Sequence, residues 1–254
     1  MLKIIELFAG SGSQTQALKN IGVEHEVIGI SEIDKYAIKA YTQLHGDANN
    51  FGDISEIKKL PKADLWTYSF PCQDLSLSGK GAGINKNTRS GLLYQVDRLL
   101  EVSEKPKYLL MENVRNLVSK RHKHDFDKWC KKLETLGYTN YWEVLNAKDY
   151  GIPQNRERVF MISILDDETG YKFPEQKELK VFLKDMLEEN VASKYYLSDK
   201  MLKYIFSDNK KFKTSKNKIV NRNIANTITT REGNTRANSS TYIVDGVENP
   251  ISIS

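Results

Sequence analysis

The chain has 254 residues, enough for one large domain or a domain and a half with a proper core. Its hydrophobic content of 39%, charged content of 28% and net charge of +5 are those of an ordinary globular protein. The longest apolar run, residues 159–165, is too short to span a bilayer, and residues 1–6 lack a signal-peptide core, so we expect a cytoplasmic protein without a membrane partner. Two cysteines, Cys72 and Cys130, are too few for a disulfide framework or a zinc site.

Short apolar runs alternate with helical patterns over the first 165 residues. Strands are predicted at residues 3–7, 26–30, 64–70, 108–112, 141–145 and 159–164. Helices are predicted at residues 13–21, 35–44, 91–102 and 126–136. This alternation predicts an α/β fold, a mostly parallel sheet with helices on both faces. Ligands of such sheets lie beyond the carboxyl ends of the strands. A glycine-rich turn, acidic residues and a cysteine all follow predicted strands.

The pattern weakens after residue 166. Residues 179–188 and 198–206 look helical, and a domain boundary is expected near residues 166–175. The whole net charge of +5 comes from residues 171–254. Residues 209–236 alone hold eight basic side chains and one acidic side chain. Composition leaves two interpretations open, a solvated flexible stretch or a surface that contacts phosphates.

A glycine-rich turn follows the first predicted strand. Phe8 and Ala9 lead into Gly10, Ser11 and Gly12 before a helix. Glycines there let a backbone approach a ligand closely, at the positive end of the helix. The spacing does not fit the dinucleotide pattern, so an ordinary tight turn is equally compatible with this segment alone.

Two acidic residues follow predicted sheet edges, at positions suited to binding a nucleoside. Glu32 follows the second strand, the position at which an acid accepts bonds from ribose hydroxyls. Asp53 follows a further possible sheet edge and has the chemistry to accept a bond from an adenine amino group. Taken singly, each is more often a helix cap or a turn former.

Pro71 interrupts the third strand and leaves Cys72 in a loop at the carboxyl edge of the sheet. A single cysteine in such a position is more often structural than reactive. The loop at residues 74–89 is long and contains three glycines, which is typical of a mobile lid.

Charged residues also flank the next two strands. Glu112 ends an apolar strand, where a carboxylate serves as a general acid or bonds a base edge. Arg156 and Arg158 precede the last strand, and alternation would turn both toward one site. The alternative is a surface ladder of ion pairs.

In this order, these segments resemble the cytosine-C5 DNA methyltransferase family. The family's motifs correspond to residues 8–12, Glu32, residues 52–54, 70–73, 112–114 and 145–158. The resemblance covers about residues 1–165 and implies a Rossmann-like methyltransferase sheet that uses S-adenosyl-L-methionine. It divides the chain into a catalytic domain at 1–170 and a linker with a partial DNA-recognition region at 171–254.

The resemblance also implies a catalytic set of Cys72, Glu112, Arg156 and Arg158. C5 of cytosine is not nucleophilic, so the family adds a thiolate to C6, and Cys72 matches that thiolate. Glu112 would contact N3 and the exocyclic amine, and Arg158 the carbonyl oxygen, with Arg156 beside Cys72. The cytosine must leave the stack of a double-stranded DNA helix to reach these groups.

The same match assigns cofactor contacts. Phe8 would stack on the adenine, Glu32 would hold the ribose, and Asp53 would bond the adenine amine. Ile33 departs from the aromatic residue common in the family, which changes the packing expected on the adenine. The remaining expected contacts are Gly10, Gly12, Ile54, Pro71 and Leu92.

The region after residue 171 resembles the family less closely. Residues 226–242 carry hydroxyl, amide and arginine groups suited to base edges, which indicates a short recognition region. The family's carboxyl-terminal motifs have no counterpart, so we expect either a second polypeptide that supplies them or a truncated product. An RNA cytosine methyltransferase and a non-catalytic nucleic-acid-binding subunit remain alternative hypotheses.

Overall fold

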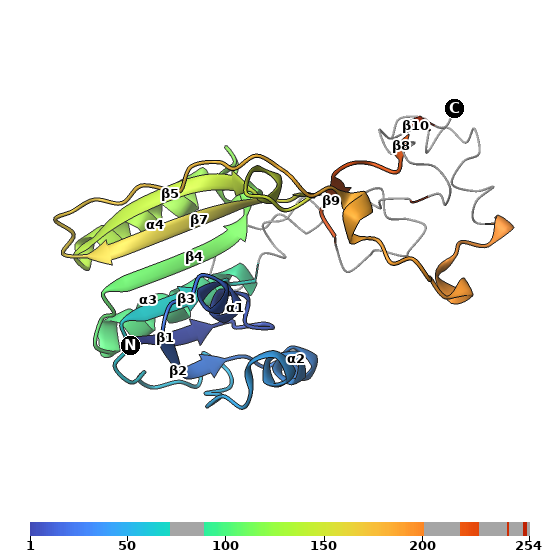
Figure 1. Cartoon of the computed structure of the whole chain (residues 1–254). Coiled ribbons are helices and arrows are strands. Elements are labelled where there is room, and N and C mark those ends of the chain that lie inside the picture. The colour runs from blue at the N-terminus through green and yellow to red at the C-terminus, as the bar shows by residue number, and fades with distance from the viewer. Residues whose placement is uncertain (72–88, 201–218, 229–242, 244–250, 253–254) are drawn as a thin grey trace. The chain divides into compact units, whose positions relative to one another are not determined.

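The structure is a computed structural model that describes residues 1–71, 89–200, 219–228, 243 and 251–252 (Figure 1). The strands are β1 (Leu2–Leu7), β2 (His25–Ser31), β3 (Leu65–Tyr68), β4 (Tyr108–Val114), β5 (Tyr138–Asn146), β6 (Gln154–Asn155), β7 (Glu157–Leu165), β8 (Ile219–Val220), β9 (Ala225–Asn226) and β10 (Ile251–Ser252). The α-helices of the described residues are α1 (Ser13–Asn20), α2 (Lys35–His45), α3 (Leu93–Val102) and α4 (Lys123–Thr135).

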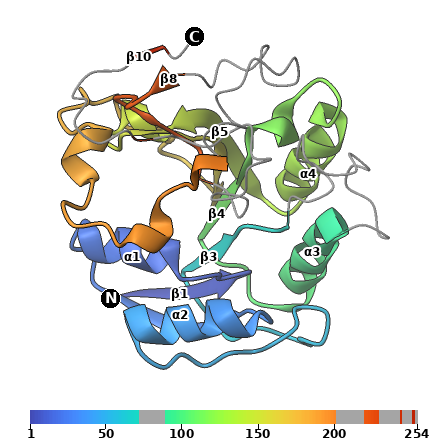
Figure 2. The ribbon, with the colours of Figure 1, turned by 90° about the vertical axis from the view of Figure 1, so that its right-hand side faces the viewer.

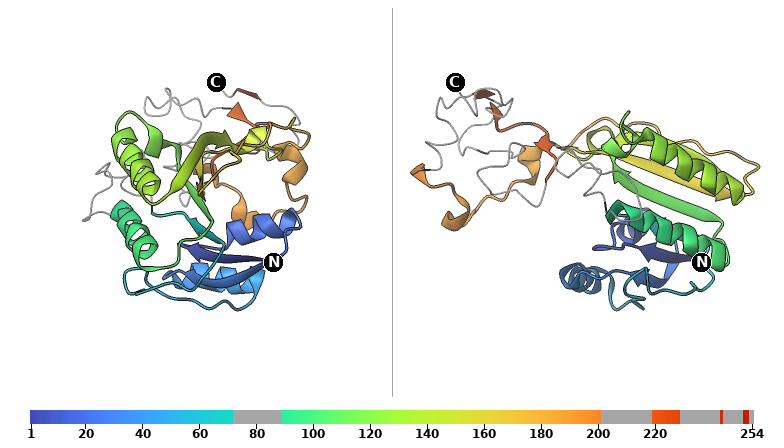
Figure 3. Two further views of the ribbon diagram at one scale, coloured as in Figure 1. Left: turned by 90° about the vertical axis from the view of Figure 1, so that its left-hand side faces the viewer. Right: turned by 180° about the vertical axis from the view of Figure 1, so that it is seen from behind.

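The six predicted strands correspond to β1–β5 and β7, which form one sheet in the order β2-β1-β3-β4-β7-β5. Strands β2, β1, β3 and β4 run parallel to one another, and β7 pairs antiparallel to β4. Helices α3 and α4 cover one face of the sheet, whereas α1 lies on the other (Figures 2 and 3). The predicted α/β fold with a mostly parallel, Rossmann-like sheet is confirmed.

The core forms because the helices on one face carry apolar stripes. Helix α3 buries four residues against the sheet, namely Leu93, Val96, Leu99 and Leu100. Helix α4 buries Trp129, whose Nε1 donates a 3.0 Å hydrogen bond to the hydroxyl of Tyr68 on β3. Burial of apolar area at about 25 cal/mol per Å² stabilises this layer.

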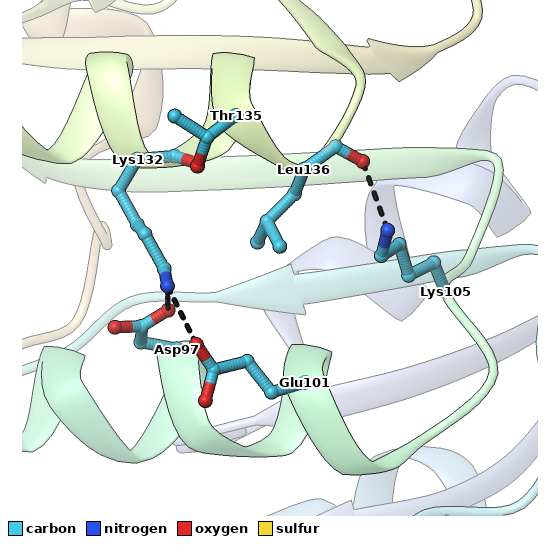
Figure 4. Close-up of polar contacts among 6 residues, drawn as sticks. All are labelled: Asp97, Glu101, Lys105, Lys132, Thr135 and Leu136. Carbon is cyan, nitrogen blue, oxygen red and sulfur yellow. Dashed lines mark hydrogen bonds and ion pairs between the residues drawn. The ribbon is translucent and has the colours of Figure 1, made fainter.

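Helices α3 and α4 are also joined at their solvent side by polar contacts (Figure 4). The ammonium of Lys132 on α4 lies 2.6 Å from Glu101 and 3.4 Å from Asp97, both on α3. Lys105 donates a 3.1 Å bond to the carbonyl oxygen of Leu136. These side chains are partly exposed, so each ion pair contributes little, and the apolar stripes carry most of the helix packing.

Two helix predictions fall after residue 173. The predicted helix at 179–188 is wrong, because only a 3₁₀ turn, Leu183–Met186, forms there. Most side chains of that segment are exposed, and a short helix without a buried face is marginal in water. The predicted helix at 198–206 lies largely outside the described residues.

The chain divides into two compact units. The first contains Met1–Leu145 and Arg158–Phe173, and the second contains Asn146–Glu157 and Pro174–Ser254. The sequence placed a boundary after residue 170, whereas the chain leaves the first unit after Phe173. A segment within the predicted catalytic domain, Asn146–Glu157, groups with the second unit.

Candidate active site

The glycine-rich turn between β1 and α1 has a left-handed backbone at three positions. Phe8, Gly10 and Gly12 have φ angles of 58°, 56° and 78°. A side chain at Gly12 would also collide with α2, since a Cβ there would lie 2.6 Å from the His45 ring and 2.7 Å from the Tyr41 ring. The turn therefore requires glycine at this position for two independent reasons.

A buried carboxylate, which sequence reasoning missed, closes the start of α1. Glu6 on β1 is 0% exposed. It accepts bonds from the Thr15 backbone amide at 3.1 Å, the Thr15 hydroxyl at 2.8 Å and the Tyr41 hydroxyl at 2.6 Å. An acid inside an apolar strand just before a glycine-rich turn was the available signal. Glu6 therefore places a carboxylate at the start of α1, where the helix dipole favours a negative charge.

Glu32 joins the turn to the end of β2. Its Oε2 accepts a 2.9 Å bond from the Gly10 amide, and its Oε1 accepts 2.8 Å bonds from the amides of Ile33 and Asp34. A carboxylate has about four acceptor positions, so Oε2 retains capacity for a hydroxyl group. Glu32 is thus fixed in place before any ligand arrives.

The other expected cofactor residues lie in different settings. Asp53 is exposed, and bonds from the amide and hydroxyl of Ser55 to its Oδ1 hold the pKa of this carboxyl below its ordinary value. Ile33 is 70% exposed, whereas Ile54 is buried in the main core. Leu92 and Pro71 are half-buried, and Leu92 packs against that core.

Glu112 and Arg158 form an ion pair across two neighbouring strands. Glu112 lies near the end of β4 and Arg158 near the start of β7, where Arg158 opposes Val114 in the antiparallel register. The Arg158 Nε is 3.1 Å from the Glu112 Oε1, with the two side chains 18% and 23% exposed. The pair presents a carboxylate and a guanidinium together at the carboxyl end of β4.

Asn113, which follows Glu112, is hydrogen-bonded to the segment that leads to Cys72. Asn113 is buried, and its Nδ2 donates a 3.0 Å bond to the carbonyl oxygen of Phe70. The end of β4 is therefore tied to the segment that continues through Pro71. Cys72 itself lies outside the described residues, as do residues 74–88 of the lid expected at residues 74–89.

Arg156 belongs to the second unit and lies between β6 and β7. The strand alternation expected to align it with Arg158 is wrong, because Arg156 is not within a strand. Its amide instead donates a 3.0 Å bond to the side-chain oxygen of Asn146, and its carbonyl accepts one from Ala147. This segment is a tight loop rather than a continuous strand.

In the second unit, the start of the expected recognition region, residues 226–242, lies beside the loop that contains Arg156. Strand β9 pairs in parallel with β6, which places Asn226 opposite Asn155. The Thr227 hydroxyl donates a 2.6 Å bond to the Asn155 carbonyl oxygen. The first part of the predicted recognition region therefore runs beside the segment that holds Arg156.

Cys130, the second cysteine, lies in α4 and contacts the core. Burial raises the pKa of its thiol to about 11, which leaves very little thiolate at neutral pH. Over the described ranges, no helix is long and apolar enough to cross a membrane, and no cluster of three His, Cys, Asp or Glu side chains is placed to hold a metal ion.

The chain is similar in sequence to known proteins of one family. A model of the C-5 cytosine-specific DNA methylase family matches residues 2–249. The type II methyltransferase M2.ScrFI of Lactococcus lactis subsp. cremoris is 41% identical, over 78% of this chain and 71% of that protein. The orphan methyltransferase M.Rho11sI of Bacillus phage rho11s is 36% identical, over 78% of this chain and 46% of its own.

Solved structures resemble the fold as well. The S. pombe Dnmt2 methyltransferase matches with a TM-score of 0.63 at 22% identity, over 80% of this chain and 64% of that one. Across these three proteins, the chain spans between 46% and 71% of the other's length. The extent of the family match and the 41% identity show that this chain belongs to the C-5 cytosine-specific DNA methylase family.

Proposed function

We propose that the chain carries the catalytic centre of a DNA cytosine-C5 methyltransferase that uses S-adenosyl-L-methionine. The observation that carries the proposal is the ion pair of Glu112 and Arg158, 3.1 Å apart at the carboxyl end of β4. Family membership supports the reaction class. In this proposal residues 1–170 form the catalytic domain and residues 171–254 the linker and part of the DNA-recognition region.

The proposed reaction begins when the thiolate of Cys72 adds to C6 of a cytosine flipped out of the duplex. The C5–C6 π electrons move to make C5 nucleophilic, and Glu112 stabilises the ring through N3 and the exocyclic amine. Arg158 contacts the carbonyl oxygen, and Arg156 lies on the Cys72 side of the base. C5 would then take the methyl group that bound S-adenosylmethionine supplies, with S-adenosylhomocysteine as the leaving group. A base would accept the C5 proton, which restores the C5–C6 double bond and expels the Cys72 thiolate.

The charge around the glycine-rich turn after β1 suits a cofactor without phosphate groups. Glu6 and Glu32 place two carboxylates around a turn whose helix end is already capped, which disfavours a phosphate. S-adenosylmethionine carries no phosphate and, when bound, supplies an electrophilic methyl group from a sulfonium. Glu32 would hold the ribose and Asp53 the adenine amine, with Phe8 against the adenine.

The other residues expected to contact the cofactor would line the same proposed site. Gly10 and Gly12 would admit the cofactor close to the backbone. Ile33, Ile54, Pro71 and Leu92 would supply apolar contact, although Ile54 is 3% exposed and could do so only through a small surface.

Double-stranded DNA is the proposed substrate. Asn226 and Thr227 would reach base edges, and the basic side chains of residues 209–236 would contact phosphates. We propose that turnover also uses the family's carboxyl-terminal motifs, carried either by a second polypeptide or by a longer form of this chain.

Transfer of a labelled methyl group tests this function. The purified chain, alone and with a polypeptide that bears the remaining family motifs, is incubated with labelled S-adenosylmethionine and either duplex DNA or RNA. We expect 5-methylcytosine in DNA, formed only or mainly in the complemented reaction, and none with Cys72→Ser. Methylation of RNA alone would favour the RNA enzyme. Absence of any product from the complemented pair would favour a binding subunit, and full turnover by the isolated chain would refute the need for a second polypeptide.

A further inference from the structure

Two aromatic side chains of α2 pack against the glycine-rich turn. Tyr41 and His45 are four residues apart, so they share one face of the helix. Their rings pack edge to face with centroids 4.8 Å apart. Neither residue belongs to the motifs that assign cofactor or base contacts.

Tyr41 connects α2 to the buried carboxylate beneath the turn. It is 2% exposed, and its hydroxyl donates the 2.6 Å bond to Glu6. Burial, followed by the bond to Glu6, raises the pKa of Tyr41 well above its ordinary value, so the hydroxyl stays protonated as a donor. Since Glu6 also caps α1 through Thr15, Tyr41 fixes the end of the turn at α1.

His45 holds the middle of the turn. Its Nε2 lies 3.0 Å from the carbonyl oxygen of Ser11, and its Nδ1 lies 3.1 Å from the ammonium of Lys19. A lysine ammonium only donates, so Nδ1 accepts and the Nε2–H donates to Ser11. His45 therefore bridges α1 and the turn.

Both rings also touch the space above Gly12. A Cβ on Gly12 would lie 2.6 Å from His45 and 2.7 Å from Tyr41, so the backbone runs directly against the two rings. The same turn presents the Gly10 amide to Oε2 of Glu32 at 2.9 Å. A displacement of the turn would consequently move the carboxylate proposed to hold the ribose.

We propose that Tyr41 and His45 are positioning residues for S-adenosylmethionine binding. They hold Gly10 and Gly12 in the left-handed conformation of the turn that fixes Glu32, and they do so without touching the cofactor. This inference rests on the proposed function, and it adds a support on α2 that the cofactor motifs do not contain.

The test compares variants of the full chain at His45. His45→Leu removes both polar contacts, whereas His45→Gln keeps an amide donor for Ser11. Leu44→Ala is the matched control, because Leu44 lies in the same helical turn and is 59% exposed. The measurements are the Kd for S-adenosylmethionine, KM and kcat in the complemented reaction, and hydrogen exchange of the amides in residues 8–16.

For His45→Leu we expect faster exchange in residues 8–16 and a Kd and KM raised about tenfold, with kcat at saturating cofactor nearly unchanged. His45→Gln and Leu44→Ala should behave like the parent. Unchanged exchange in His45→Leu would overturn the inference, whatever the affinity. Faster exchange with an unchanged Kd would also overturn it while leaving the proposed function intact. A parent chain that binds no S-adenosylmethionine in the complemented state would instead refute the function itself.

Discussion

The glycine-rich turn of the first unit and strand β9 of the second are both anchored by backbone hydrogen bonds. Among the described residues, buried polar side chains support only the turn. Glu6 and Tyr41 beneath the turn are 0% and 2% exposed, whereas Asn226 and Thr227 are only half-buried. The first arrangement is set before a ligand binds. The second arrangement depends on the pairing of two-residue strands, β6 and β9. Rearranging this pair costs less free energy than rearranging the buried network beneath the turn, which suits a region proposed to adjust to DNA.

The largest effect is expected at the ion pair of the first unit. Glu112→Gln keeps the size of the side chain but removes its charge, which should lower the rate of methyl transfer about 10²- to 10⁴-fold. The Kd for S-adenosylmethionine should not change, because Glu112 faces the base in the proposed site. Single-turnover kinetics measures the rate, with the exposed Glu143→Gln as control. A loss of less than threefold would remove Glu112 from the reaction.

The next effect concerns the stability of the turn. Glu6→Leu leaves three buried donor groups without their carboxylate, so we expect a loss of about 3–5 kcal/mol in the free energy of unfolding. Glu26→Leu, at an exposed position of β2, should change it by less than about 0.5 kcal/mol. Urea denaturation measures both. Equal stability of the two variants would show that the buried network does not hold the turn.

This contrast also separates what the sequence could predict from what it could not. The central strands β4 and β7 carry nearly continuous apolar runs, as strands buried in the middle of a sheet require, so their places follow from the sequence. Glu6 was missed because a single charge in an apolar strand gives no indication of its partners, Thr15 and Tyr41, which come from two helices. The roles of the site residues stay predictions, and Cys72 lies outside the described residues.

The second unit was harder to predict for a physical reason. Strands β6 and β9 are two residues long, and their pairing depends on backbone bonds between segments far apart in the chain. No hydrophobic period marks such a pair. The predicted helix at 179–188 failed in a related way, because an apolar pattern without a surface to pack against does not stabilise a helix.

A smaller effect is expected from the basic stretch. The side chains of Lys211, Lys213, Lys216 and Lys218 lie outside the described residues and are proposed to contact phosphates. Neutralising all four to Gln should weaken binding to every DNA sequence and reduce the salt slope by up to about 3.6, at about 0.9 per phosphate contact. Filter binding at several salt concentrations measures the slope. An unchanged slope would mean that the stretch is solvated surface.

The smallest effect is expected at β9. Thr227→Val removes the hydroxyl bond to Asn155 and should destabilise the second unit by about 1 kcal/mol. We expect faster hydrogen exchange in residues 153–156 and weaker discrimination between DNA sequences, with the stability of the first unit preserved. Thr169→Val, in the first unit, is the control for the substitution. Unaltered exchange in residues 153–156 would show that this bond does not hold the pair.

Covalent trapping with DNA that contains 5-fluorocytosine tests the central claim most directly. Fluorine at C5 cannot leave as a proton does, so the bond between the Cys72 sulfur and C6 should persist after methyl transfer. We expect the complemented parent to form an adduct that mass spectrometry places on the peptide of Cys72. Cys130→Ser should trap equally well, since burial raises the pKa of Cys130 to about 11, and Cys72→Ser should form none. Equal trapping by Cys72→Ser, or an adduct on Cys130, would contradict the account.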